Sequence, residues 1–207
     1  MPELRSGIER TDFVPSLVVG VLALQGGYAA HEAVFARLGA STRQVKTPSD
    51  LDRLDGLVIP GGESTTMTLG IEREGLAGPL RELAQAGTPI LGTCAGLIML
   101  DRDHLGIMDI RAERNAFGRQ IHSFESDLTI TGIDGGPVRA VFIRAPRIAD
   151  AGPGVEILAA VDGEPVAARE AASTVVAFHP ELSGEDRIHA AWLGEVRDRQ
   201  AAISSPA

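Results

Sequence analysis

The segment that decides the fold is Pro89–Leu100, which reads Pro-Ile-Leu-Gly-Thr-Cys-Ala-Gly-Leu-Ile-Met-Leu. A short apolar run, typical of a buried strand, leads into a Gly-x-Cys-x-Gly turn, and a second apolar run predicts a helix after it. This is the layout of a nucleophile elbow, in which a sharp strand-to-helix turn carries the reactive side chain at its apex. The flanking glycines suit a strained and closely packed backbone. Cys94, the single cysteine of the chain, is therefore a candidate nucleophile.

The pattern of strand, glycine turn and helix occurs twice more before this segment. A continuous apolar run such as Leu17–Leu24 is typical of a strand that is buried on both faces of a parallel sheet. Gln25-Gly26-Gly27 breaks that run, and a helix with a good glycine stop follows. The expected elements are strands over Leu17–Leu24, Gly56–Pro60 and Pro89–Leu91, helices over Ala29–Leu38 and Leu76–Ala86, and a further helix capped by Ser64-Thr65-Thr66.

The second half of the chain contains short β-like runs that are separated by Gly or Pro, and then one amphipathic helix over about Glu185–Arg199. These runs are Leu128–Thr131, Val138–Ile143, Val155–Val161, Pro165–Ala168 and Thr174–Ala177. We predict an α/β fold with three layers: a flavodoxin-like, mostly parallel central sheet, helices on both of its faces, and some antiparallel edge strands. One domain is expected over residues 17–200, after a disordered or extension leader at 1–16 and before a frayed C-terminus at 201–207.

The composition is that of an ordinary globular protein, and it excludes several classes of function. The chain has 207 residues, 44% of them hydrophobic and 23% charged, which suits a single α/β domain. A net charge of −9 argues against nonspecific binding to nucleic acid or to an anionic membrane. One cysteine excludes an internal disulfide, and we expect a cytoplasmic location because no signal-peptide pattern is present. No metal-ligand motif is present, so no metal site is expected.

A candidate base follows far downstream, in Phe178-His179-Pro180-Glu181. In an extended segment the side chains of His179 and Glu181 point the same way, so the carboxylate can orient the imidazole while the other ring nitrogen faces Cys94. The pKa of a thiol falls at a helix N-terminus or beside an imidazole. A lone cysteine in apolar surroundings is usually a small buried hydrophobe. The elbow together with the His-x-Glu pair instead favours cysteine-based acyl transfer.

Acyl transfer also needs hydrogen-bond donors for the developing oxyanion. The backbone N–H of Ala95, directly after the nucleophile, is one candidate, and the Gly61-Gly62 turn, through Gly62, is the second. The remaining histidines have no comparable surroundings and are expected to be structural or exposed; they are His31, His104, His122 and His189.

On these residues the chain resembles the triad (class I) glutamine amidotransferases, and within them the glutaminase subunits of pyridoxal 5′-phosphate synthases. The matching segments are 20–26, 60–67, 92–98, 113–120, 123–125, 140–146 and 178–182. The elbow and His-Pro-Glu are general to the superfamily. The Gly-Gly-Glu-Ser-Thr-Thr string and the Arg-Asn-Ala-Phe-Gly-Arg-Gln string are much more specific to this subunit.

The resemblance implies that glutamine is hydrolysed to glutamate and ammonia through a thioester on Cys94, with His179 moving protons and Glu181 orienting it. It implies no cofactor. The ammonia would pass to a partner synthase subunit, a (β/α)₈ barrel, within a heteromeric lyase complex, and docking of that barrel would complete the oxyanion hole. Gln25 matches a position near that interface. The positions that match the glutamine-binding residues of the family are Gly62, Glu63, Ser64, Arg114, Ile143 and Arg144.

The chain departs from the family pattern at two places. Only Asp101-Arg102-Asp103 separates the elbow helix from His104, and Gly27 stands where a side chain is common. Two other readings stay open at this point: the glutaminase subunit of another amidotransferase, such as that of histidine biosynthesis, or a non-catalytic binding subunit.

Overall fold

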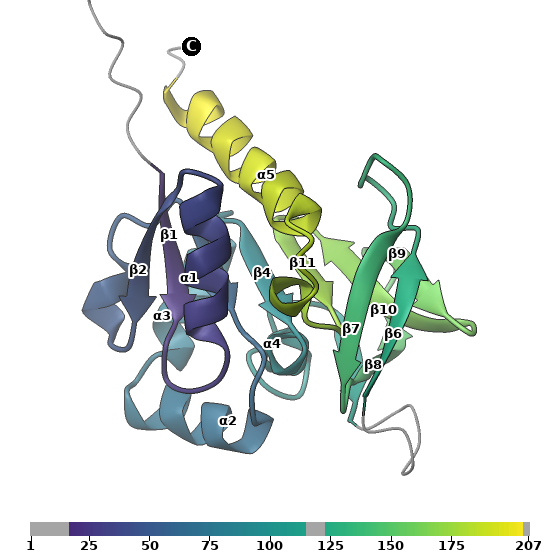
Figure 1. Cartoon of the computed structure of the whole chain (residues 1–207). Coiled ribbons are helices and arrows are strands. Elements are labelled where there is room, and N and C mark those ends of the chain that lie inside the picture. Colours follow the sequence, from purple (N-terminus) through teal and green to yellow (C-terminus); the bar gives the residue numbers. More distant parts are fainter. Residues whose placement is uncertain (1–16, 115–122, 205–207) are drawn as a thin grey trace, which may run out of the picture.

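The computed structural model describes residues 17–114 and 123–204. The predicted leader and most of the Arg114–Gln120 string lie outside the described residues. Within the described part, a seven-stranded sheet lies between helices that cover both of its faces (Figure 1). The predicted α/β architecture with three layers is confirmed.

The centre of the sheet is parallel, and one edge of it is antiparallel. The parallel strands, in spatial order, are β2 (Ser41–Val45), β1 (Val18–Leu22), β3 (Gly56–Ile59), β4 (Ile90–Thr93) and β11 (Ser173–Val176). Beyond β11 the sheet continues with β10 (Glu164–Glu170) and β9 (Glu156–Val161), both antiparallel to their neighbours. The edge strand β2 was not predicted, because its sequence, Ser-Thr-Arg-Gln-Val, contains no apolar run.

Alternation of side chains along the strands assigns the helices to the two faces. Val19 and Val21 of β1 point to one face, where they share a core cluster with Phe35 and Trp192. The helices on that face are α1 (Tyr28–Arg37) and α5 (Arg187–Ser204), which lie in front of the sheet in Figure 1. Leu22 of β1 points to the other face and joins the larger cluster. That cluster includes buried residues of α2 (Ser64–Arg73), α3 (Ala77–Gln85) and α4 (Ala95–Leu100).

Two short antiparallel pairs lie beside the main sheet. They are β5 (Ile110–Glu113) with β8 (Arg147–Ala151), and β6 (Ser123–Leu128) with β7 (Val138–Ile143). Two 3₁₀ turns, η1 (Pro48–Leu51) and η2 (Pro180–Leu182), complete the described elements. The strand expected over Leu128–Thr131 is wrong: β6 ends at Leu128, and a turn with Gly132 at positive φ follows.

Two helix ends also differ from expectation. The side chain of Glu63, rather than the Ser64-Thr65-Thr66 segment, caps α2. The final helix, which was predicted to end near Arg199, continues to Ser204, because Ala-Ala-Ile-Ser contains no helix breaker. Within the part of the chain that the structure describes, no helix combines the length and apolarity needed to cross a membrane.

The four neighbouring strands β1, β3, β4 and β11 are parallel, so their carboxyl ends meet at one edge of the sheet. The segments that leave these ends carry Gln25, Gly62, Cys94 and His179, respectively. Sites in doubly wound sheets form at this edge. The topology therefore gathers four predicted site residues from turns that lie far apart in the sequence.

Candidate active site

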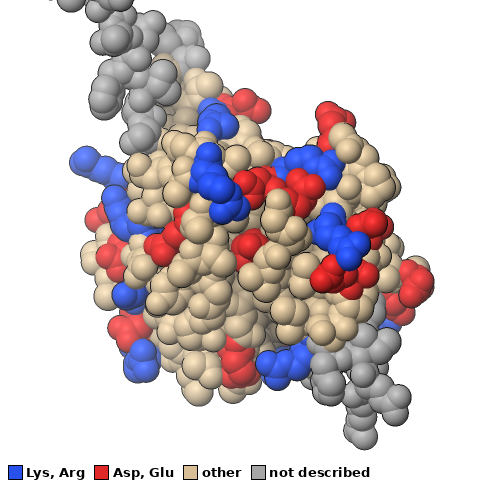
Figure 2. All heavy atoms as spheres, viewed as in Figure 1, with Lys and Arg blue, Asp and Glu red and all other residues tan. Residues whose placement is uncertain are grey.

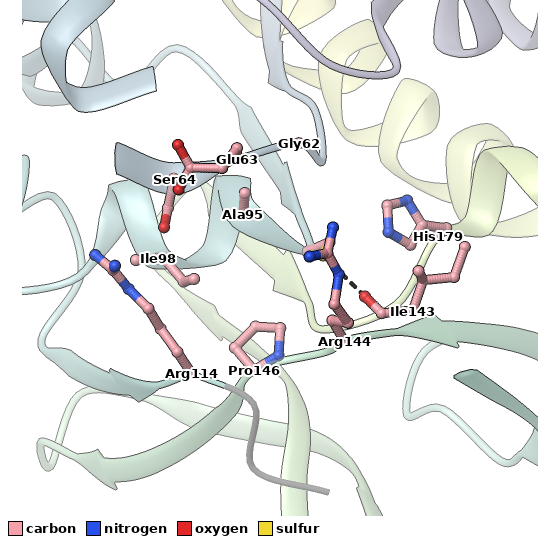
Figure 3. A pocket seen from close by; sticks show the side chains of 11 residues that line it. Gly62, Glu63, Ser64, Ala95, Ile98, Arg114, Ile143, Arg144, Pro146 and His179 are labelled. Atoms are coloured by element: carbon pink, nitrogen blue, oxygen red, sulfur yellow. Dashed lines mark hydrogen bonds between the residues drawn. The ribbon is translucent and has the colours of Figure 1, made fainter. Parts of the chain in front are cut away.

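A pocket of about 350 Å³ opens at this edge of the sheet (Figure 3). It brings together Cys94, Ala95 and His179 with all of the predicted glutamine-binding positions, while Glu181 and Gln25 lie outside its lining. Two of the lining residues, Ile98 and Pro146, were not predicted from the sequence. Ile98 lies one helical turn after Cys94, and this spacing could have indicated it. The lining residues are Gly62, Glu63, Ser64, Cys94, Ala95, Ile98, Arg114, Ile143, Arg144, Pro146 and His179.

The backbone at Cys94 has the strained geometry of a nucleophile elbow. Its φ of 48° and ψ of −106° lie in a region that a residue with a side chain rarely adopts. The neighbouring strand fixes this turn, because the N–H of Cys94 donates to the carbonyl of Val176 at 2.8 Å. A glycine is needed at position 61, since a Cβ there would overlap the ring of His179 and lie 3.2 Å from Cβ of Cys94. Cys94 and His179 therefore flank Gly61.

His179 is oriented from both its backbone and its ring. Its N–H donates to the carbonyl of Val141 at 2.8 Å, and its Nδ1 lies 2.7 Å from Oε1 of Glu181. Glu181 reaches the ring from the 3₁₀ turn η2, so the expectation of an extended His-Pro-Glu segment is wrong although the pairing forms. Burial opposes the charge of His179, but hydrogen bonds with Cys94 and Glu181 outweigh it and raise the pKa of His179 to about 10.

Two buried histidines lie behind the triad carboxylate. Nε2 of His31 is 3.4 Å from Oε2 of Glu181 and 3.2 Å from Oγ1 of Thr93. Nδ1 of His31 is 2.9 Å from Nε2 of His189, and both rings are fully buried. Burial lowers the pKa of His31, and burial followed by the charge of His31 lowers the pKa of His189 to about 3. His31 and His189 were predicted to be structural or exposed, and no local sequence pattern links them to His179.

These two histidines predict a dependence of stability on pH. Their pKa values are lowered in the folded state, so the unfolded chain binds more protons below the ordinary histidine pKa of 6.5. Their contribution to stability is therefore present above pH 6.5 and is lost as the pH falls. Each histidine adds a slope of about 1.4 kcal/mol per pH unit. We expect urea unfolding at pH 7, 6 and 5 to give a steadily falling free energy, and His189→Phe to reduce that slope by about half. A flat profile would contradict the neutral buried pair.

The two proposed oxyanion donors lie in different turns. Ala95 is the first residue of α4, so its N–H has no acceptor within the helix. Gly62 lies in a segment that Gln25 holds: Nε2 of Gln25 donates to the carbonyl of Glu63 at 2.9 Å, and its Oε1 accepts from the N–H of Glu63 at 3.1 Å. The N–H of Gly27 also donates to the carbonyl of Gly61 at 3.1 Å. The turn after β1 thus braces the segment that carries Gly62.

The carboxylate of Glu63 caps its own helix. Oε1 accepts from the N–H of Thr65 at 2.9 Å, and Oε2 accepts from the N–H and the hydroxyl of Thr66 at 2.6 and 2.7 Å. These hydrogen bonds lower the pKa of Glu63 to about 2, led by the hydroxyl of Thr66. Glu63 stays ionised at any pH near neutrality and presents a negative charge beside the pocket.

The two arginines of the pocket lie at different places in it. In Figure 3, Arg114 lies near Ser64 and Ile98, whereas Arg144 lies toward His179. Arg144 has a positive φ of 46°, and the carbonyl of the preceding residue, Ile143, lies 3.9 Å from Sγ of Cys94.

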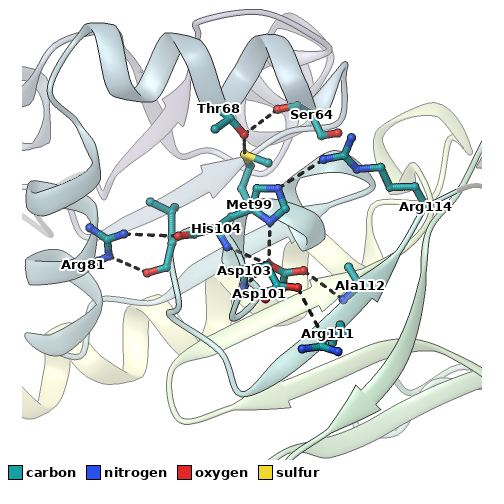
Figure 4. A network of polar contacts seen from close by, with 11 residues as sticks. Ser64, Thr68, Arg81, Met99, Asp101, Asp103, His104, Arg111, Ala112 and Arg114 are labelled. Atoms are coloured by element: carbon teal, nitrogen blue, oxygen red, sulfur yellow. Dashed lines mark hydrogen bonds and ion pairs between the residues drawn. The ribbon is translucent and has the colours of Figure 1, made fainter.

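The shortened segment after Leu100 forms a tight turn that supports Arg114 (Figure 4). Oδ1 of the buried Asp101 accepts from the N–H groups of Asp103 and His104 at 2.9 and 3.1 Å and pairs with Nδ1 of His104 at 2.7 Å. Nε2 of that ring lies 3.5 Å from Nη2 of Arg114. The turn at His104 does not line the pocket itself, but it contacts Arg114, which does.

Metal binding finds no support in the described residues, where no three His, Cys, Asp or Glu side chains are grouped as metal ligands would be.

The fold is that of a glutamine amidotransferase. A solved structure described as "Crystal structure of glutamine amidotransferase" is 39% identical, with a TM-score of 0.82 over 86% of this chain and 98% of that one. The fold alone also matches "Structure of PurLQS from Thermotoga maritima", at 16% identity and a TM-score of 0.71 over 87% of this chain and 99% of that one.

Sequence similarity identifies the family to which the chain belongs. The model of the SNO glutamine amidotransferase family matches residues 21–198, so the chain belongs to that family. A "Pyridoxal 5'-phosphate synthase subunit PdxT" from Pelotomaculum thermopropionicum is 50% identical over 84% of this chain and 93% of that protein. The protein of the same name from Geobacillus kaustophilus is 48% identical over 90% of this chain and 98% of that protein.

Proposed function

We propose that this chain is the glutaminase subunit of a pyridoxal 5′-phosphate synthase, which hydrolyses L-glutamine to L-glutamate and passes the ammonia to a synthase subunit. One observation carries the proposal: the pocket joins Cys94 and His179 to the predicted glutamine-binding positions. The chain belongs to a glutamine amidotransferase family, and its relatives are named as subunits of that synthase.

The geometry supports a reaction in two halves. In the first, His179 already holds the thiol proton, in keeping with its raised pKa, and Sγ of Cys94 attacks the side-chain amide carbon. The N–H groups of Ala95 and Gly62 stabilise the oxyanion. The C–N bond then breaks, His179 gives a proton to the leaving nitrogen, and ammonia departs from a glutamyl thioester.

In the second half, His179 takes a proton from water, and the resulting hydroxide attacks the thioester carbon. The C–S bond of the second oxyanion breaks, glutamate leaves, and the thiolate of Cys94 remains beside the protonated His179. Glu181 holds Nδ1 of His179 throughout, so that the opposite ring nitrogen stays directed at the sulfur.

The charges around the pocket fit the two ends of free glutamine. A guanidinium can hold the α-carboxylate through two hydrogen bonds, and Arg114 and Arg144 both line the pocket. The ionised Glu63 and the carbonyl of Ile143 are acceptors suited to the α-ammonium. Ser64 adds a hydroxyl near Arg114, and we assign these residues together to substrate binding.

The proposed partner is a (β/α)₈ barrel synthase subunit that docks near Gln25. Gln25 holds the backbone of Glu63, so a contact there would act on the segment that carries Gly62. On the face seen in Figure 2, acidic and basic side chains are intermixed and no broad basic surface gathers. Together with the net charge of −9, this favours a protein partner over nucleic acid or a membrane, and we keep the cytoplasm as the proposed location.

Glutaminase assays with and without the barrel subunit test this function. We expect ammonia release to rise by about 10²-fold on docking, the effect typical of one oxyanion donor. The same complex with Cys94→Ala is the control, and it should release no ammonia. A rise with another acceptor enzyme, such as that of histidine biosynthesis, would contradict the assignment to pyridoxal 5′-phosphate. Absence of activity with every acceptor would point to a non-catalytic subunit.

A further inference from the structure

The carboxylate of Glu181 faces two histidines, and only one of them belongs to the triad. Its Oε1 lies 2.7 Å from Nδ1 of His179. Its Oε2 is buried and makes no hydrogen bond of good geometry with any described residue, yet Nε2 of His31 lies 3.4 Å away. A buried carboxylate oxygen without a donor is costly. His31 is the group placed to supply one.

The positions of the two inner rings decide which nitrogens carry hydrogen. Burial holds His31 and His189 in the neutral form, so each ring has one N–H. An ionised carboxylate only accepts, so the hydrogen of His31 belongs on Nε2, which faces Glu181 and Thr93. Nδ1 of His31 then accepts from Nε2–H of His189, 2.9 Å away. This leaves Nδ1 of His189 bare, and that atom is indeed buried without a hydrogen-bond partner among the described residues.

The opposite arrangement is disfavoured at both ends. It would place a bare nitrogen of His31 against the carboxylate, with only the hydroxyl of Thr93 as a donor to that nitrogen, and it would leave an N–H of His189 buried without an acceptor. Both faults cost free energy. The hydrogen bonds therefore run in one direction, from His189 to His31 to Glu181.

A second feature also directs positive potential at the same carboxylate. Gly27 is the N-cap of α1, and a Cβ on Gly27 would lie only 3.4 Å from Oε1 of Glu181. The N-terminus of a helix favours negative charge. His31 lies on the first turns of the same helix, so α1 presents both its end and a side chain to Glu181.

We propose that His31, supported by His189, is a positioning residue of the active site: it donates to Oε2 of Glu181 and so holds the carboxylate that orients His179. This proposal rests on the triad roles given above. His31 also contacts Thr93, the residue before Cys94, and thereby joins the nucleophile strand to the carboxylate. The charged groups around the pair are Glu181, His179, and the Arg37–Asp186 ion pair near His189.

Two variants at His31 distinguish a role of this residue as a hydrogen-bond donor from a role in packing alone. His31→Leu removes the donor, whereas His31→Gln keeps an N–H at a similar reach. With the synthase subunit present, we expect His31→Leu to lower kcat about 10- to 100-fold, the value of a hydrogen bond to a charged group. KM should stay within about twofold, because His31 does not line the pocket. His31→Gln should recover most of the rate, and the acid limb of the kcat profile of His31→Leu should move to higher pH.

The control is Val34→Ala, which removes buried methyl groups from the same helix without touching the polar chain. It should lower the melting temperature but leave kcat and its pH profile unchanged. A His31→Leu rate within about twofold of the parent, or an equal loss in His31→Gln, would overturn the proposal. If His31→Leu does not fold, His189→Phe takes its place, with a smaller expected loss of kcat and the same shift of the acid limb.

A measurement without turnover separates this inference from the function itself. Nitrogen-15 NMR of the imidazoles at pH 7 should show His31 and His189 both neutral with hydrogen on Nε2. Hydrogen on Nδ1 of His31, or a charged ring, would overturn the inference even if the glutaminase is active. An inactive parent complex with the expected tautomers would instead overturn the proposed function alone.

Discussion

Cys94→Ala is expected to abolish ammonia release while leaving the chain folded and able to bind its partner. The substitution deletes one atom, Sγ, from a residue that is only 7% exposed, so the outer surface barely changes. Alanine carries the same Cβ as cysteine, and the strained φ of 48° is therefore no worse for it. Loss of the nucleophile of a triad typically costs on the order of 10⁶-fold in kcat.

The measurement has two arms. Ammonia release is followed in the complex, and binding of the synthase subunit is followed by calorimetry or sedimentation. We expect no detectable turnover and a Kd within about twofold of the parent. Retained turnover would remove Cys94 from its proposed role, and equal loss of both properties would show that the residue is structural. A glutamine-analogue electrophile should also modify the parent at Cys94, which mass spectrometry can locate.

Gly96→Ala is expected to cost at least about 3 kcal/mol of folding free energy, the upper range of overpacking in a core. A Cβ on Gly96 would overlap the carbonyl oxygen of Ile59 and lie 2.9 Å from its carbon. Both of these atoms belong to the backbone of β3, so no side-chain rotation can relieve the clash. Because Gly96 lies two residues after Cys94, any shift of α4 should also displace the nucleophile, and activity should fall even in molecules that stay folded.

The matched control is Gly194→Ala in α5. No described heavy atom lies within 4 Å of a Cβ built on Gly194, and its backbone φ is ordinary for a helix. This substitution should stabilise the protein by up to about 1 kcal/mol, because alanine is the better helix former. Urea unfolding of both variants measures the contrast. A Gly96→Ala variant as stable as the parent would contradict the close approach of α4 to β3.

The strands β1, β3, β4 and β11 were predicted because a strand that is buried on both faces is apolar throughout. Those that were missed, β2, β5, β6 and β8, are short or half-exposed, and their polar residues leave no apolar run to detect. The capping of α2 by Glu63 was also missed, because Glu is not among the residues that are preferred at the N-cap. Pro146 lines the pocket through packing that no local pattern encodes, whereas the spacing of Ile98 from Cys94 could have indicated Ile98.

The candidate site likewise contains residues that local sequence patterns predict and residues that only the tertiary structure brings together. Gly-x-Cys-x-Gly and His-x-Glu are local patterns. The nucleophile and the base could be predicted from them, because strained turns and paired donors need particular residue types at fixed spacing. His31 and His189 carry no such pattern, since 158 positions separate two rings that lie 2.9 Å apart. Their contact depends on how α1 and α5 pack on one face of the sheet.

Local order along the chain thus specified the parallel sheet, the elbow at Cys94 and the base at His179, because these features depend on neighbours within a few residues. Folding alone decided that Arg114 reaches the pocket past His104 and that Glu181 has a second histidine behind it. The reason is physical: these contacts join segments from different strand ends, and only the closing of the sheet brings those ends within hydrogen-bond distance.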